Sequence, residues 1–343
     1  MNPVDNKSSH PNAIIAAYLT EHTTEYQLLS ELRQRGWNNP EGDLFFQRQR
    51  QNADEADSRT AIFFFRMMKN IGQEMQKCTK ALRINHTYQP RILDLCFAPG
   101  GFLATALRLN PSASAMGFSL PPSQGGHRDL LPSHPNIQLK FLDVTMLAED
   151  MGATEIPAGH PDAERFLPRQ FADEQTFDLI FCDGQVLRTH ERAAYRERRE
   201  AARLSISQLA LGLEHIYPGG TMVVLLHKVE AWDTVKLLYQ FSQFSSVRLF
   251  KPRKSHSKRS SFYMIARNIQ REQPEAIRAI AQWKRLWKAA TFGTDQMYLE
   301  ALNEDGLDPA TLLEEFGPRL VKLGRKVWEI QATALEGAPF TQG

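Results

Sequence analysis

The stretch from Arg91 to Phe102, RILDLCFAPGGF, has the residue types of a nucleotide-like binding turn. Its apolar first half is typical of a strand that is covered on both faces, and Gly100 and Gly101 let the backbone approach a ligand where a Cβ atom would collide. The three-glycine fingerprint of dinucleotide sites is absent from the sequence, so no pyrophosphate cradle is implied. The pattern favours a cofactor that has an adenosine but no phosphates.

Three charged residues, Asp143, Asp183 and Lys228, each stand at the end of an apolar run. A charged side chain beside such a run is costly to desolvate unless it is paired or lies in a cleft. If the runs are parallel strands, their carboxyl ends meet at the edge of the sheet where α/β proteins bind ligands. The residues therefore predict a functional edge. For Asp183 and Lys228, an ordinary ion pair at the strand ends is the alternative interpretation.

Strands and helices alternate between residues 90 and 266, which predicts an α/β fold with a doubly wound sheet. The expected strands are Ile92–Phe97, Ser114–Ser119, Ile137–Leu142, Phe177–Cys182, Thr221–Leu226, Val247–Phe250 and Phe262–Ala266. A polar, basic loop joins the last two strands instead of a helix, so we expect an antiparallel hairpin at the edge of the sheet.

The motif Asp94-Leu95-Cys96-Phe97-Ala98-Pro99-Gly100-Gly101-Phe102 resembles the cofactor motif of the FtsJ-like S-adenosylmethionine-dependent methyltransferases, which has Asp-Leu followed by Ala-Pro-Gly-Gly and an aromatic residue. The resemblance implies a Rossmann-like sheet of seven strands with an antiparallel last strand. It also implies S-adenosyl-L-methionine as the cofactor and the ribose 2′-hydroxyl of RNA as the acceptor. The cofactor contacts that it implies in this motif are Asp94, Ala98, Pro99, Gly100, Gly101 and Phe102.

The resemblance also implies the catalytic residues. Asp183 and Lys228 occupy the places of the aspartate and the second lysine in the lysine, aspartate, lysine, glutamate tetrad of the family. Lys228 would then remove a proton from the acceptor hydroxyl, while Asp183 orients the lysine and steadies its charge. Ser261 stands where the tetrad has its glutamate. The first lysine has no direct counterpart, and Lys69 or Lys77 could fill its role only with a shifted geometry.

Further cofactor contacts follow from the same resemblance. Asp143 would accept a hydrogen bond from the adenine amino group, and helix capping is the alternative role for this residue. After the second strand the family usually has an acidic residue that holds the ribose, whereas this sequence offers only Ser119. Asp183 is also expected to contribute to the cofactor site.

Two basic segments are candidates for substrate contact. The loop 251–259, KPRKSHSKR, could neutralise RNA phosphates through Lys251 and Arg253, with Ser261 just beyond it. A solvated edge hairpin is the alternative interpretation of this loop. Arg188 and His190 follow Asp183 and are further candidates. After them comes a helix-like run in which arginines, among them Arg192, Arg196 and Arg203, alternate with glutamates, a pattern that favours an exposed, salt-bridged face.

The bulk composition limits the classes to which the protein can belong. The 343 residues include 41 Lys plus Arg and 39 Asp plus Glu, a formal charge of +2, so any basic face must be local. Three cysteines, an odd number, argue against a disulfide framework and favour a reducing compartment. The sequence has no Cys or His spacing typical of a metal site, and no apolar run approaches the ~20 residues of a membrane span. A cytoplasmic or nuclear protein without metal is expected.

The pattern predicts four parts of the chain. They are a disordered tail (1–12), a helical N-terminal extension (13–84), the methyltransferase-like domain (85–269) and a helical C-terminal extension (270–343). Three functions are compatible with the sequence. The first is methylation of an RNA ribose, the second is methylation of a small molecule or a protein, and the third is a catalytically inactive binding module, which the incomplete tetrad would explain.

Overall fold

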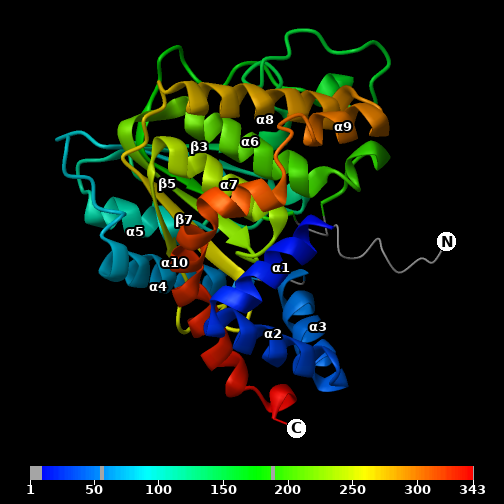
Figure 1. Ribbon diagram of the computed structural model, residues 1–343. Helices are drawn as coiled ribbons and strands as arrows, with labels where there is room; N and C mark the ends of the chain where they lie inside the picture. The colour runs from blue at the N-terminus through cyan, green and yellow to red at the C-terminus, as the bar shows by residue number, and fades with distance from the viewer. Residues whose placement is uncertain (1–9, 55–57, 187–189, 343) are drawn as a thin grey trace.

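The apolar runs of the sequence form the strands of one central sheet. The computed structural model describes residues 10–54, 58–186 and 190–342, and the seven strands within them have the order β3-β2-β1-β4-β5-β7-β6 (Figure 1). The strands are β1 (Arg91–Asp94), β2 (Ser114–Ser119), β3 (Ile137–Phe141), β4 (Phe177–Cys182), β5 (Ile216–His227), β6 (Ser246–Phe250) and β7 (Ser261–Arg267). The neighbours among β1 to β5 are parallel, and β7 is antiparallel to β5 and β6. The predicted fold class and the edge hairpin are confirmed.

Alternating side chains of the strands face two separate cores. In β4, Leu179 and Phe181 belong to one buried cluster, while Ile180 and Cys182 belong to the other. This is the period of two that a pleated strand imposes. Because all four side chains are apolar and buried, β4 must be covered on both faces, as parallel strands usually are.

Helices α4 (Ser58–Thr79) and α5 (Gly101–Leu109) cover the first face. Gly101, the first residue of α5, is where α4 approaches most closely. A Cβ atom at this position would lie 2.5 Å from the Cβ atom of Met68 and 2.5 Å from the carbonyl oxygen of Phe65. The glycine therefore permits two helices to pack almost backbone to backbone.

We expect Gly101→Ala to lower the free energy of unfolding by about 1–3 kcal/mol, because the added methyl group would overlap α4. Gly337→Ala is the matched control, since a Cβ atom there meets nothing within 4 Å. Urea denaturation compares the two variants with the wild type. Equal midpoints for Gly101→Ala and Gly337→Ala would contradict the close packing of α4 on α5.

The second face is covered by α6 (Glu200–His215) and α7 (Trp232–Phe244), with α8 (Pro274–Phe292) and α9 (Asp295–Leu302) following later in the chain. Figure 1 shows α8 lying along α6 in an outer helical layer. The indole of Trp287, on α8, is buried and donates a hydrogen bond to the Thr145 carbonyl oxygen at 3.0 Å. This bond fixes α8 to the segment that follows β3, close to the carboxyl edge of the sheet.

The terminal helices share the core of the second face. They are α1 (Pro11–His22), α2 (Thr24–Trp37), α3 (Pro40–Asp54) and α10 (Pro309–Glu336). Arg33 of α2 bonds both Glu230, after β5, and Gln331 of α10, at 2.6 and 3.0 Å. The two helical extensions therefore form one packed unit with the sheet. In the part of the chain that the structure describes, no helix has an apolar stretch that could cross a membrane.

Several predicted boundaries differ from the structure; the largest difference is in β5, which begins at Ile216 instead of Thr221. Helix α1 begins at Pro11, after His10, whose side chain caps it, so the end of the predicted tail is helical; residues 1–9 lie outside the described residues. Strand β1 ends at Asp94 instead of Phe97. After Asp94 the chain turns toward Gly100, although the N–H of Leu95 still donates to the Phe181 carbonyl at 3.1 Å. The apolar residues Leu95 and Phe97 after Asp94 are buried, but they are not part of the strand.

Candidate functional site

Asp94 and Asp183 lie at the carboxyl ends of β1 and β4, which are neighbours in the sheet. Asp94 is fully buried, and its Oδ1 accepts a bond from the N–H of Cys96 at 3.3 Å. Its Oδ2 and the Oδ1 of Asp183 are buried and have no hydrogen-bond partner among the described residues. Two carboxyl groups with unused oxygen atoms therefore adjoin at this edge.

The environment of these two carboxyl groups disfavours their charged forms. Burial raises the pKa of Asp183 to about 7. Burial, and then the charge of Asp183, raise the pKa of Asp94 well above its ordinary value. Two like charges in a dry site cannot both ionise cheaply. Of the two, Asp183 is the group whose pKa of about 7 lies near neutrality.

Lys228 lies farther along the edge than the resemblance implies. Cys182 pairs with Val224 in the register of β4 and β5, so continuing the register by one residue brings Leu225 opposite Asp183. Lys228 is exposed three residues beyond, in a left-handed turn with φ of 49°. The alternative interpretation was an ion pair between Asp183 and Lys228. Oδ1 of Asp183 has no hydrogen-bond partner among the described residues, so this atom does not take part in such a pair.

Asp143 is engaged by a buried arginine. Its Oδ1 accepts bonds from the backbone N–H and the hydroxyl of Thr145, at 3.0 and 2.8 Å, and its Oδ2 accepts one from Arg196 at 2.6 Å. Burial pushes the pKa of Asp143 upward, but the Arg196 guanidinium outweighs it and the pKa is lowered. The residue caps the short 3-10 turn η2 (Val144–Met146), as the alternative interpretation predicted, and both of its oxygen atoms are occupied.

Arg196 is the centre of a buried ionic cluster. Its guanidinium, which is fully buried, also bonds Glu200 at 2.5 Å and lies 3.9 Å from Asp162. Ligand atoms of Asp143, His190 and Glu200 come within 4.8 Å of one another, which is close enough to hold a metal ion. In this structure the Arg196 guanidinium supplies the positive charge beside Asp143 and Glu200.

The arginine-rich run predicted an exposed face, and this prediction is wrong for Arg196 and Arg203. Arg196 and Arg203 are fully buried, and α6 begins only at Glu200. Glu200 accepts bonds from both arginines, at 2.9 Å from Nε of Arg196 and 2.9 Å from Nη1 of Arg203. The alternating charges do pair, as predicted, but they pair inside the protein because α8 and the segment after β3 cover this part of the chain.

Protein atoms fill the space above the glycine turn. Gly100 has φ of 104°, a left-handed conformation that suits glycine, and a Cβ atom there would lie 2.6 Å from Cγ of Leu131. The N–H of Leu130 donates to the Pro99 carbonyl at 3.2 Å. The loop 120–136 thus covers the turn at which the sequence predicts a ligand. Pro99 and Phe102 are buried and Ala98 is half-buried.

A small cavity of about 60 Å³ remains at this edge. Its walls include Cys96, Ser119, Asp143, Gln185 and His190. Nε2 of His190 is buried without a hydrogen-bond partner among the described residues, and burial lowers the pKa of this imidazole. His190 is therefore neutral near pH 7. Nε2 of His190, which lies 3.9 Å from Oδ2 of Asp143, and the unpaired oxygen atoms of Asp94 and Asp183 are polar atoms at this edge without a hydrogen bond among the described residues.

The other substrate candidates have different surroundings from those expected. Lys251 is buried, and its amine donates to the carbonyl oxygens of His256, Arg259 and Ser261 at 3.1, 2.7 and 2.8 Å. It closes the loop 251–259 from inside and does not face a phosphate. Arg253 is exposed, Ser261 is buried opposite His227 in β5, and Arg188 lies outside the described residues.

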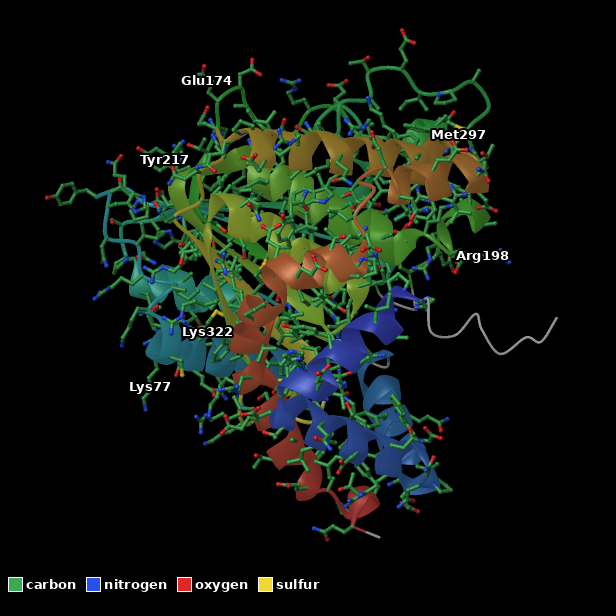
Figure 2. The ribbon with its side chains drawn as sticks, in the orientation of Figure 1. Lys77, Glu174, Arg198, Tyr217, Met297 and Lys322 are labelled. Carbon is green, nitrogen blue, oxygen red and sulfur yellow. The ribbon has the colours of Figure 1, made fainter. Side chains whose placement is uncertain are left out.

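The two helical lysines that the resemblance left as candidates for the first tetrad position both lie on α4. Lys69 lies on α4 beside Gly101, and its amine sits over the ring of Phe65 at 5.3 Å from the centroid. Lys77 is near the end of the same helix and exposed (Figure 2). The structure adds two residues that the sequence did not single out as site residues, Leu131 over the glycine turn and Arg196 on Asp143. A lone leucine in a loop and an arginine in a charged run carry no signal of these positions.

The unused polar atoms fit the cofactor that the resemblance implies. A nucleoside brings hydroxyl and amine groups that can pair with Asp94, Asp183 and His190, and apolar walls for its base are present in Leu120, Leu142 and Val144. Sites for ligands of this size have volumes of roughly 300 Å³ or more. The loop 120–136 must therefore shift away from Gly100 for the cofactor to enter.

Comparisons with known proteins agree with the resemblance. Residues 73–269, more than half of the chain, match the model of a family described as FtsJ-like methyltransferase. Over 216 residues the chain is 25% identical to the pre-rRNA 2'-O-ribose RNA methyltransferase FTSJ3 of Gallus gallus, a match that covers 60% of this chain and 22% of that protein. The chain thus spans about a fifth of the length of that relative.

Solved structures align with part of this chain at low identity and low TM-score. The N-methyltransferase NodS of Bradyrhizobium japonicum WM9 aligns with a TM-score of 0.37 and 13% identity over 59% of this chain and 98% of its own. The fibrillarin/Nop5p complex aligns with a TM-score of 0.34 and 13% identity, over 56% of this chain and 78% of its own. The family model covers all seven strands and the edge where Asp94 and Asp183 meet. The chain belongs to the FtsJ-like family of S-adenosylmethionine-dependent methyltransferases.

Proposed function

We propose that the protein transfers a methyl group to a ribose 2′-hydroxyl of RNA. The observation that carries the proposal is the Asp183 carboxyl group, which has an unpaired oxygen and a pKa of about 7 at the edge of a methyltransferase sheet. The chicken relative, described as a pre-rRNA 2'-O-ribose RNA methyltransferase, supports RNA as the acceptor. When bound, S-adenosylmethionine supplies an electrophilic methyl group.

In this proposal the protein positions the two reactants and handles one proton. Ser119 and His190, which line the small cavity, hold the cofactor together with Asp94 and Asp183, whose unpaired oxygen atoms lie at the same edge of the sheet. The Asp143 carboxylate, fixed by Arg196, shapes the wall of the cavity. Asp183 orients the acceptor hydroxyl and accepts its proton, since a base works best when its pKa lies near the working pH. The resemblance gives proton removal to Lys228. Its exposed place at the rim favours contact with the acceptor instead.

Methyl-labelled S-adenosylmethionine tests this proposal with three extracts: total RNA, small metabolites and protein. We expect the label in RNA, and specifically in dinucleotides that survive alkaline hydrolysis, because a methylated 2′-oxygen cannot attack the adjacent phosphate. Label in the mononucleotides that alkali releases would mean a methylated base and would contradict the ribose assignment.

A second candidate is methylation of a small molecule. A cavity of about 590 Å³ runs from Gln185 and His227 at the carboxyl edge into the space among α6, α7 and α8. Its volume suits a small organic acceptor, and Leu237 of α7 is part of its wall. If this candidate holds, Leu237→Trp fills the cavity and stops labelling of the metabolite fraction. If RNA is the acceptor, the same variant still labels RNA.

A further inference from the structure

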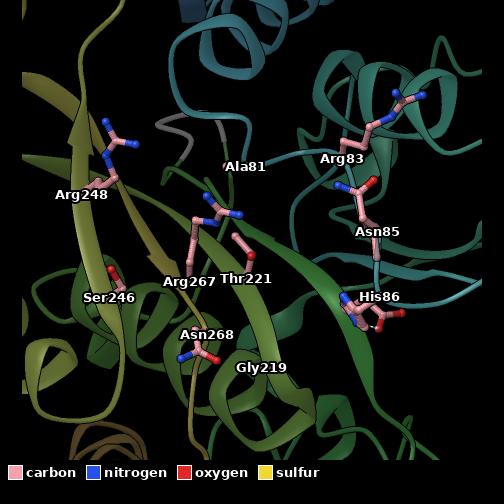
Figure 3. Close-up of a pocket in the computed structure, with 12 residues that line it drawn as sticks. Ala81, Arg83, Asn85, His86, Gly219, Thr221, Ser246, Arg248, Arg267 and Asn268 are labelled. Atoms are coloured by element: carbon pink, nitrogen blue, oxygen red, sulfur yellow. Dashed lines mark hydrogen bonds and ion pairs between the residues drawn. The ribbon is translucent and has the colours of Figure 1, made fainter.

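A separate cavity lies at the opposite end of the strands from the cofactor edge. It has a volume of about 620 Å³ and is formed by the segment before β1, the amino ends of β4 to β6 and the carboxyl end of the antiparallel β7 (Figure 3). The residues that give it its character are Arg83, His86, Asp178, Thr221, Arg248 and Arg267. We call it the amino-end groove.

The amino-end groove is positively charged. Figure 3 shows Arg83, Arg248 and Arg267 on three different elements around it. All three side chains are exposed, and among the described residues they form no ion pair. The acid in the wall, Asp178, is already engaged, because one oxygen contacts His86 at 2.6 Å and the other accepts the Arg91 N–H at 2.7 Å. Three positive charges therefore face the groove without a neutralising partner.

Aromatic side chains accompany these charges. The ring of His86 stacks on Tyr217 with centroids 5.7 Å apart and planes 14° from parallel. Tyr217 is 43% exposed, and Tyr88, two residues beyond His86, is 96% exposed. The Tyr217 side chain lies at the surface in Figure 2. Tyr217 adjoins the groove through His86, which lines it. Exposed aromatic rings together with unpaired arginines are the combination with which proteins bind single-stranded nucleic acids, by stacking on bases and contacting phosphates.

We propose that the amino-end groove binds the sugar–phosphate backbone of single-stranded RNA. Arginine suits phosphate oxygens because its planar fork donates two parallel bonds. The exposure of all three arginines favours a strand that passes through the groove over a mononucleotide enclosed in it. The proposal takes the identity of its ligand from the proposed function. Along β5, Thr221 and His227 are about 20 Å apart, so one RNA can touch both ends only if it is long.

Fluorescence anisotropy with a labelled, unstructured 30-nucleotide RNA tests the groove. The double variant Arg248→Gln with Arg267→Gln should bind about tenfold more weakly than the wild type near 100 mM salt. The slope of the logarithm of the association constant against that of the salt concentration should fall by about 1.4 in magnitude, since each lost contact to a single strand contributes roughly 0.7. The matched control, Arg285→Gln with Lys288→Gln, removes two charges from exposed positions on α8 and should bind RNA as the wild type does.

The outcomes separate this inference from the proposed function. Wild-type affinity and salt slope in the groove variant would overturn the groove alone. ATP that binds tightly to the wild type and loses affinity in the groove variant, while RNA affinity is unchanged, would make the groove a mononucleotide site and would also overturn the proposal. A wild-type protein that binds no RNA would count against the RNA acceptor as well, and the labelling experiment then decides between acceptors.

Discussion

Asp183→Asn is expected to lower methyl transfer at least 100-fold and, at pH 8, to make the protein more stable. The loss of activity follows because an amide cannot accept the proton of the acceptor hydroxyl, a contribution of roughly 10²–10⁴ in rate. The gain in stability follows from the pKa of Asp183, which is raised from 3.8 to about 7. Ionising Asp183 therefore costs the folded protein more free energy than it costs the unfolded chain, and at pH 8 the folded protein bears that cost.

The sign of the stability change depends on pH. A group whose pKa is raised by folding contributes its full stability below the unfolded pKa and loses it as the pH rises through the folded pKa. Ionised Asp183 is thus a cost to the wild type above pH 7, and the neutral amide removes that cost. We expect the melting temperature to rise by about 2–4 °C at pH 8, as for a change near 1 kcal/mol, and by less at pH 5.

The matched control is Asp173→Asn. Its side chain is 87% exposed and pairs with Arg169 at the surface, so neither activity nor melting temperature should change measurably. Calorimetric scans at the two pH values and the labelling assay give both readouts. An Asp183→Asn protein that melts below the wild type at pH 8 would contradict the dry, unpaired environment assigned to this carboxyl group.

Arg196→Met is expected to lower the free energy of unfolding by about 3–5 kcal/mol, because it leaves buried acids without their counter-charge. Asp143 and Glu200 lose hydrogen bonds of 2.6 and 2.5 Å, and Asp162 loses a cation at 3.9 Å. Methionine nearly preserves the buried volume, so the loss reports charge and not a cavity.

Arg198→Met is the control for this prediction. It removes the same charge from an exposed side chain, two residues along the chain from Arg196 (Figure 2). Its free energy of unfolding should stay within about 0.5 kcal/mol of the wild type. Urea denaturation followed by circular dichroism measures both variants. If Arg196→Met and Arg198→Met lower the free energy of unfolding equally, the ionic cluster around Arg196 does not hold Asp143 in place.

The sequence predicts the sheet well because its strands are covered on both faces. The run Phe177–Cys182 is apolar or buried at every position, and its boundaries agree with the structure. The edge hairpin was also predictable, since only a polar loop separates β6 from β7. These features depend on local composition and on chain connectivity, which the sequence contains directly.

The surroundings of the site depend on segments far away in the chain, and local patterns do not contain them. Gly100 and Gly101 were interpreted as room for a ligand, whereas Leu131 and α4 approach them in the structure. Lys251 looked like a solvent-facing cation, but three backbone carbonyls of its own loop surround the amine. The tetrad spacing likewise placed Lys228 next to Asp183, while the register gives that place to Leu225.

The central claim is that the carboxyl edge with Asp94 and Asp183 receives a sulfonium nucleoside once the loop 120–136 moves aside. Isothermal titration of the intact protein with S-adenosyl-L-homocysteine tests it most directly. We expect one molecule to bind per chain, with an affinity that improves in Leu131→Ala because less apolar contact holds the loop over Gly100. Absence of binding to both the wild type and Leu131→Ala would contradict the claim.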